Sequence, residues 1–319
     1  MLIDKRKVNK KLRDIALGAI ETVENVTNVT KKVVDKSSEV IVETLDANRD
    51  GEADIEDIII AALRTPGSRV DREEFFRKVF EEKYGEETIE VAIKKNPLKA
   101  SISMIEIDEI ANEIIKSERN FVTGISATLG TQGGVGLIAA VPADIIQYHV
   151  YLIRIAQKLL YLYGFPKIDM EEKSSGFDEA TINLFTICLG IMNEIEGTSD
   201  AIKVVSKAQY NGSKKRDMKK ILTEGVIEEE AEDAAEWFEE RMVKSFIASS
   251  VKAMVPIVSS VICGTSTFAS FETCADNLRD VLKDTALSNP GHEESKEEKK
   301  LWKKLEQVVI ENKNKDKEE

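Results

Sequence analysis

Residues 133–165 read GGVGLIAAVPADIIQYHVYLIRIAQKLLYLYGF, and this stretch decides the fold. From about residue 142 to 163 the side chains are apolar on most of a helix circumference, which is typical of a segment buried on all sides. The sequence GFP follows at 164–166, and glycine with a nearby proline is the usual end of a helix. We therefore expect a central, buried helix here, with the rest of the chain packed around it.

A glycine-rich segment precedes this helix. Residues 121–143 carry no charge and contain five glycines, among them Gly130 and Gly134, which follow Ser126 at steps of four. Small residues at this spacing lie on one face of a helix and allow two backbones to approach closely. A second uncharged run covers residues 253–271 and contains one proline. We interpret the first segment as part of a glycine-rich, buried helical hairpin.

Lipid is the alternative environment for these two runs. A spanning helix needs about 20 predominantly apolar residues. The first run is instead diluted by polar side chains, namely Thr123, Ser126, Thr128, Thr131 and Gln132. Burial within a soluble protein is therefore favoured over peripheral membrane contact, and both are favoured over true spanning.

Helical periodicity covers most of the remaining chain, and no sustained period-two alternation predicts a strand. The fold class is therefore all-α, a multi-helix bundle. Expected helices cover residues 1–45, 58–64, 71–84, 86–95, 102–119, 178–196, 199–208, 213–223, 226–254 and a final segment to about 282.

Breaks in this pattern divide the chain into three regions. Asn96-Pro97 closes a helix, because proline disfavours helical backbone in the residue before it. We expect an N-terminal helical region over 1–97, a helical core over 98–285, and a charged, partly disordered tail over 286–319. The tail has one apolar stripe, formed by Leu301, Trp302, Leu305 and Val309.

The segment DANRDGEADIED, residues 46–57, matches an EF-hand-like cation loop with helical patterns on both sides. Such a loop presents oxygen ligands from positions 1, 3, 5, 7, 9 and 12 around a glycine at position 6. The predicted metal ligands are therefore Asp46, Asn48, Asp50, the main-chain carbonyl of Glu52, Asp54 and Asp57. Gly51 stands at the turn. The expected ion is Ca2+, with Mg2+ as the alternative.

Two departures from the pattern affect the choice of ion. Position 12 is Asp57 in place of the usual glutamate, and its shorter side chain weakens Ca2+ binding relative to Mg2+. Position 8 is Ala53, and no second complete loop is present to pair with the first. An acidic helix-to-helix turn without metal is the alternative interpretation, because Asp, Asn and Gly favour turns in any case.

The same central stretch resembles the signature of the EcsC protein family. The matching features are the glycine cluster from 133, Pro142-Ala143-Asp144, Arg154, and the sequence LYGF at 162–165. MVPIVSSVICG at 254–264 is similar to that family's later proline-containing hairpin, although Ser259, Ser260 and Thr265 stand where glycines are usual. The resemblance covers roughly residues 100–285 and leaves out the cation loop. It implies a helical core and no established enzymatic activity.

Composition excludes several classes of function. With 45 basic and 58 acidic residues the net charge is -13, which disfavours nucleic acid as a partner. Three scattered cysteines indicate neither a disulfide framework nor a zinc site, and the N-terminus lacks the layout of a secretory signal. A cytoplasmic location is therefore expected. With only His149 and His292 in the chain, a multi-histidine metal site is excluded.

These observations favour a non-catalytic, calcium- or magnesium-binding helical protein that interacts with another protein. The alternative is a peripheral membrane protein whose glycine-rich hairpins face lipid, with a purely structural cation loop. A third hypothesis is an enzyme built around Asp144, His149 and Arg154, although these three residues are more typical of a buried structural cluster.

Overall fold

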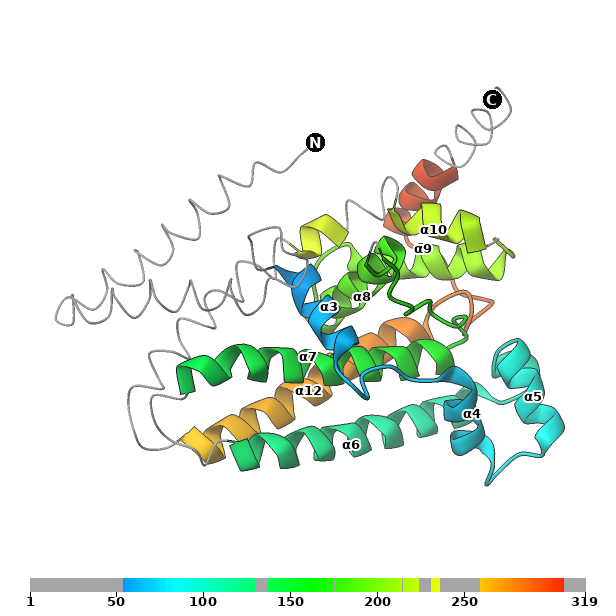
Figure 1. Cartoon of the computed structure of the whole chain (residues 1–319). Helices are drawn as coiled ribbons and strands as arrows, with labels where there is room; N and C mark the ends of the chain where they lie inside the picture. Colours follow the sequence, from blue (N-terminus) through cyan, green and yellow to red (C-terminus); the bar gives the residue numbers. More distant parts are fainter. Residues whose placement is uncertain are drawn as a thin grey trace.

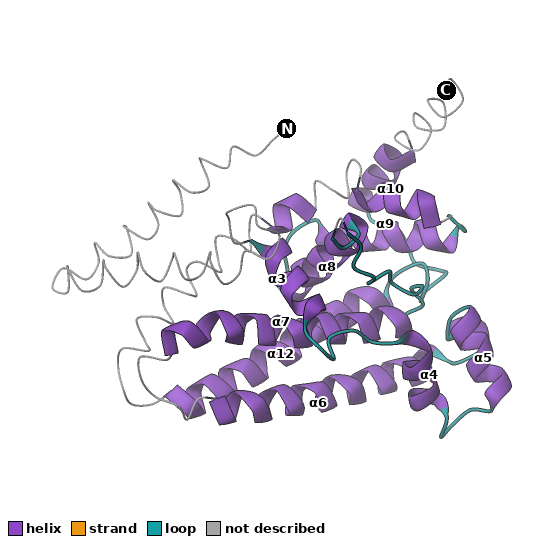
Figure 2. Ribbon diagram, in the orientation of Figure 1, coloured by secondary structure: helices purple, strands orange, loops and turns teal. Residues whose placement is uncertain are grey.

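A computed structural model describes the backbone of residues 54–129, 137–174, 176–213, 215–223, 231–235 and 259–306, with the side chains of all but 121–129, 137–145, 215–217 and 259–269. The described part consists of helices, turns and loops without a strand, which confirms the predicted all-α class (Figure 2). The helix predicted over residues 1–45 lies outside the described residues, as does most of the one predicted over 226–254.

Ten helical elements have defined bounds. In chain order they are α3 (Ile55–Arg64), α4 (Arg72–Phe80), α5 (Glu86–Lys94), the 3-10 turn η1 (Leu98–Ala100), α6 (Met104–Leu129), α7 (Leu137–Leu162), α8 (Glu179–Met192), α9 (Thr198–Tyr210), α10 (Lys215–Thr223) and α12 (Ser259–Lys283). Residues 231–235 and 296–306 are also helical.

Three long helices, α6, α7 and α12, form the body of the fold and run alongside one another (Figure 1). Helix α12 contacts both α6 and α7, and it also packs against α8 and α9. Helix α3 lies on α7 and α8, so the element that follows the predicted cation loop is part of the main helical packing.

Several helix ends have the local causes that the sequence indicates. Asp71 caps α4 by accepting a hydrogen bond from the Glu74 N–H at 2.9 Å, and Asp178 caps α8 through the Ala180 N–H at 3.1 Å. Helix α7 ends at Leu162, two residues before Gly164, whose φ of +98° is favourable only for glycine. The Phe165 N–H then reaches back to the Leu160 carbonyl at 2.9 Å, which closes the helix.

Other predicted boundaries were wrong. Helix α4 ends at Phe80, four residues before Tyr84, and Gly85 precedes α5 as its N-cap. Helix α6 continues from 119 to Leu129, into the uncharged segment. Helix α7 begins at Leu137, so the predicted start at Pro142 falls in its second turn. A proline there removes one intrahelical hydrogen bond without ending the helix. Gly130, Gly133, Gly134 and Gly136 lie outside the described residues.

The described helices share one hydrophobic core. Its members come from α3, α4 and α5 before residue 97, from the long helices after it, and from Leu301 and Leu305 near the end. The predicted boundaries at 97 and 285 therefore separate segments that pack into the same cluster. Among the described helices, none is both long enough and apolar enough to span a bilayer.

Candidate functional site

The described end of the predicted cation loop is the first turn of α3. Asp54 is the N-cap, and its carboxylate oxygen Oδ1 accepts a hydrogen bond from the Asp57 N–H at 3.0 Å. In return, the Asp54 N–H donates to Asp57 Oδ2 at 3.1 Å. This reciprocal pair is a capping box, which satisfies two backbone donors that the helix leaves without intrahelical partners. The Asp57 residue is 0% exposed.

The capping box brings together two of the six predicted ligands, those at positions 9 and 12. The carboxylate of Asp57 turns back toward the residue before the helix, which is the direction that a ligand at position 12 requires. The other four, Asp46, Asn48, Asp50 and Glu52, lie outside the described residues. Within the described residues alone, no group of three or more carboxylate, imidazole or thiolate side chains is arranged to hold a metal ion.

Beyond its first turn, α3 is held by apolar packing. Ile58, Ile59, Ala62 and Leu63 are each at most 1% exposed and form the inner face of the helix against α7 and α8. Burying such side chains contributes about 1.5 to 3 kcal/mol each for the larger ones. The two carboxylates of the capping box are therefore fixed to a rigid part of the core.

A buried glutamine anchors the chain that leaves α3. The side chain of Gln157, on α7, is 0% exposed and donates from Nε2 to the Ser68 carbonyl at 2.9 Å. Its Oε1 accepts from the Val70 N–H at 2.8 Å. These bonds replace the water that the two backbone groups lose on burial. Helix α3 is therefore connected to α7 at its far end as well as along its inner face.

Arg154 is the residue of the predicted polar cluster on α7 whose charged partners are described. Arg154 pairs with Glu118 of α6, with 3.2 Å between Nη2 and Oε1, and Lys158 donates to the same oxygen. The Glu118 side chain is 8% exposed, so these cations offset a charge that is costly to bury. His149 is half-buried with its ring edge against Tyr148. The side chain of Asp144 lies outside the described residues.

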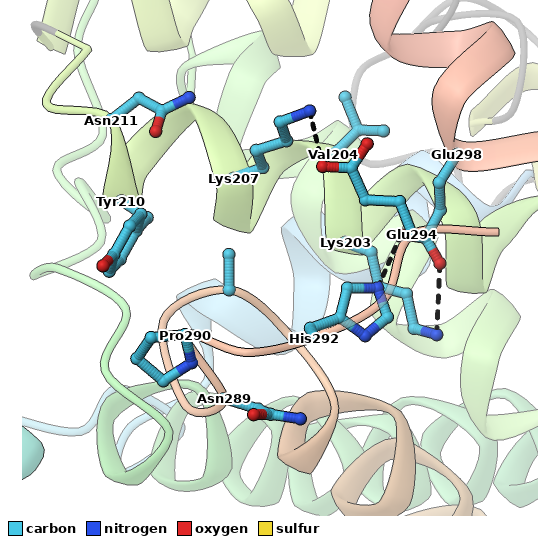
Figure 3. A pocket seen from close by; sticks show the side chains of 11 residues that line it. Lys203, Val204, Lys207, Tyr210, Asn211, Asn289, Pro290, His292, Glu294 and Glu298 are labelled. Carbon is cyan, nitrogen blue, oxygen red and sulfur yellow. Dashed lines mark hydrogen bonds and ion pairs between the residues drawn. The ribbon is translucent and has the colours of Figure 1, made fainter.

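A cavity of about 160 Å3 lies elsewhere, between α9 and the segment after α12 (Figure 3). Lys203 and Lys207 of α9 line one side, and His292, Glu294 and Glu298 line the other. The lysines are paired across it: Lys207 Nζ lies 2.7 Å from Glu294 Oε1, and Lys203 Nζ lies 3.3 Å from Glu298 Oε1. His149 and Arg154, the two residues of the enzyme hypothesis whose side chains are described, do not line this cavity.

This arrangement is not evident from the sequence, because the tail reads as a run of solvated charges. The one local signal was the apolar stripe in the tail, which predicts a helix docked on the protein. That helix is present at 296–306, with Leu301 7% and Leu305 3% exposed.

No family model matches the chain, and neither a curated protein nor a solved structure gives a significant match to it. The functional assignment therefore rests on the residues of this chain.

Proposed function

We propose that this chain is a non-catalytic protein of the cytoplasm that binds Ca2+ or Mg2+ at residues 46–57 and interacts with another protein. The observation that carries the proposal is the pair of hydrogen bonds between Asp54 and Asp57 at the start of α3. The capping box alone accounts for these bonds. The sequence adds oxygen-bearing side chains at positions 1, 3 and 5 with glycine at 6, which a simple cap does not require.

In this proposal the cation acts through α3. Asp57 is 0% exposed and precedes Ile58, which packs in the core at 1% exposure. The Asp54 and Asp57 carboxylates lie at the N-terminus of α3, where negative charge is favourable. A cation coordinated by these carboxylates and by the loop joins the first turn of α3 to the loop. Because α3 contacts α7 and α8, ion binding then biases how the N-terminal region packs on the core. In this proposal, the partner protein recognises the change in how the N-terminal region packs on the core.

We also propose that residues 100–285 form an EcsC-like core. The support is the pattern quoted above: the PAD sequence at 142–144 lies within α7, and the LYGF sequence at 162–165 forms its end. Tyr163, Gly164 and Phe165 are buried, so the LYGF sequence contributes to the packing of the core.

Hydrogen exchange with and without ion tests the mechanism. We expect Ca2+ or Mg2+ at about 1 mM to slow hydrogen exchange of the amides in α3, since stabilising a helix terminus suppresses local opening. The matched control is Asp46→Ala, in which the ion should leave α3 unchanged. Slower exchange of equal size in both proteins would contradict binding at the loop. Co-sedimentation of the same proteins with anionic liposomes tests the membrane alternative, which requires binding that is independent of Asp46.

A further inference from the structure

His292 is held between two carboxylates in the segment after α12. Its Nδ1 lies 2.9 Å from Asp284 Oδ1, and its Nε2 lies 2.7 Å from Glu298 Oε2. The imidazole side chain is 8% exposed, and the Glu298 side chain is 3% exposed. The Asp284 side chain is 50% exposed. Both ring nitrogens are therefore used, one by a buried and one by a partly exposed carboxylate, on different structural elements.

This geometry requires a charged ring. An ionised carboxylate only accepts hydrogen bonds, and a neutral imidazole has one donor and one acceptor, so only the imidazolium can donate to both. Burial by itself disfavours the charge, but the hydrogen bonds to Glu298 and Asp284 outweigh it and raise the pKa of His292 above its ordinary value. Burial also opposes the charge of Asp284, but the bonds from His292, Asn289 and Lys203 lower the pKa of that carboxyl.

Helix α9 faces this pair with charges of both signs. Lys203 Nζ lies 3.3 Å from Asp284 Oδ2 and 3.3 Å from Glu298 Oε1. Asp200 accepts a hydrogen bond from the Ser295 hydroxyl at 3.3 Å, and burial and the nearby Glu298 and Glu297 raise its pKa. Farther along, Lys207 is paired with Glu294. Once His292 is neutral, Lys203 is the cation that remains in direct contact with Asp284 and Glu298.

The contacts of His292 join the end of α12 to the helix 296–306. Asp284 directly follows α12, and Glu298 lies in the first turn of the terminal helix. That helix buries Leu301 and Leu305, and its Trp302 ring lies 4.2 Å from Lys207 Nζ of α9. Two kinds of contact therefore hold the terminal helix in place. Its apolar packing does not change with pH, whereas the hydrogen bonds of His292 change when the imidazole loses its proton.

We propose that His292 is a proton-sensitive latch that holds the terminal helix 296–306 against the end of α12 and releases it when the imidazole loses its proton. Deprotonation removes one of the two donors and leaves one of the two carboxylates facing a nitrogen lone pair. Release uncovers the apolar face of the terminal helix and opens the cavity beside Lys203 and Lys207. The latch shares no residue with the predicted cation loop at 46–57, and it does not depend on ion binding there.

The direction of the pH effect follows from the raised pKa of His292. The stabilisation from the latch is fully present below the unfolded pKa of histidine, about 6.5. It is lost as the pH rises through the higher pKa of the folded state. The terminal helix is therefore closed below pH about 6.5 and opens at a pH above that value.

Hydrogen exchange of the full chain across pH 6 to 9, expressed as protection factors, tests the latch. We expect protection of the amides in 297–306 to fall by about tenfold or more above the transition, since one charge-assisted hydrogen bond is typically worth that factor. His292→Gln should show low protection at every pH. His149→Gln, which changes the other histidine of the chain, should keep the wild-type transition. A transition that persists in His292→Gln, or protection that is constant in the wild type, would overturn the proposal.

Two further measurements keep the test decisive if His292→Gln folds poorly. Glu298→Gln removes one of the two charges that stabilise the imidazolium, so the transition should move to lower pH. The imidazole resonances of the wild type, which contains two histidines, report the titration of His292 directly. A midpoint at or below 6.5 for His292, or no shift in Glu298→Gln, would also overturn the latch.

Discussion

Asp54 and Asp57 exchange hydrogen bonds across the first turn of α3, each carboxylate accepting from the backbone N–H of the other residue. This arrangement caps the helix, and in the proposed cation site the same Asp57 carboxylate is the ligand at position 12. Variants that change the length or charge of this carboxylate separate the two roles.

We expect Asp57→Glu to tighten Ca2+ binding relative to Mg2+. Glutamate restores the longer side chain that coordinates Ca2+ through both oxygens at position 12. Glutamate is also the usual third residue of a capping box, so the bond to the Asp54 N–H can be kept. Titration of both ions by calorimetry measures the change in selectivity. Glu56→Asp is the control, because it alters the adjacent, exposed carboxylate. An equal or weaker preference for Ca2+ in Asp57→Glu would mean that position 12 does not coordinate.

Gln157→Leu is expected to lower the free energy of unfolding by about 2 to 4 kcal/mol. The Val70 N–H and the Ser68 carbonyl lose their partner, and each buried, unsatisfied backbone group costs about 1 to 3 kcal/mol. Urea denaturation provides the measurement. Gln147→Leu, on the same helix with a half-buried side chain that bonds Tyr151 at 2.7 Å, should cost less than about 1 kcal/mol. Equal losses in the two variants would show that the bonds of Gln157 are unimportant.

Gly190→Ala tests the close packing of α8 against the start of α9. A Cβ atom at Gly190 would lie 2.6 Å from Thr198 Cγ2, which is too close for either atom to remain in place. Overpacking costs about 1 to 3 kcal/mol, partly offset by about 1 kcal/mol of helix propensity gained over glycine. We therefore expect a net loss of roughly 1 kcal/mol in urea denaturation.

Thr198→Ser provides the matched partner for this test. It removes Cγ2 and retains the hydroxyl, which donates to the Ile195 carbonyl at 2.7 Å. In the double variant the new methyl of residue 190 has more room, so the two losses should not add. If the losses in free energy of unfolding of the two single variants simply add, the contact with Thr198 does not cause the loss in Gly190→Ala.

The thiols of the core should be unreactive in the native state. Burial raises the pKa of Cys188 to about 12 and also raises that of Cys274. At pH 8 the reactive thiolate is then only about one part in ten thousand for Cys188. We expect iodoacetamide to label Cys188 only after denaturation, with mass spectrometry as the readout. Rapid labelling of the native protein would show that α8 opens locally far more often than its burial indicates.

Much of the local structure could be predicted from the sequence because its causes are local. The sequence predicts helices that begin at 71 and 178 and a terminating glycine at 164. Asp71 and Asp178 cap the first two helices, and Gly164 has the positive φ angle typical of such an end. The extent of α6 and α7 could not be predicted in the same way. Glycines and an internal proline weaken helical propensity, whereas neighbouring helices decide whether such a segment still forms a helix.

Long-range pairings explain most of what was missed at the candidate sites. Arg154 meets Glu118, 36 residues earlier, and Lys203 meets Asp284, 81 residues later. Helical periodicity shows which face of a helix is buried, but it does not identify the helix that covers that face. In the tail, the many charged residues suggest a segment exposed to solvent. The side chains of His292 and Glu298 are nevertheless buried.

Calorimetric titration of the purified full chain with Ca2+ and Mg2+, beside the Asp46→Ala variant, tests the central claim most directly. We expect saturable binding of one ion per chain by the wild type and its loss in Asp46→Ala, because removing the ligand at position 1 deletes a charged oxygen that water does not replace. Binding of either ion with unchanged affinity in Asp46→Ala, or no heat of binding in the wild type, would contradict the claim that residues 46–57 form a cation site.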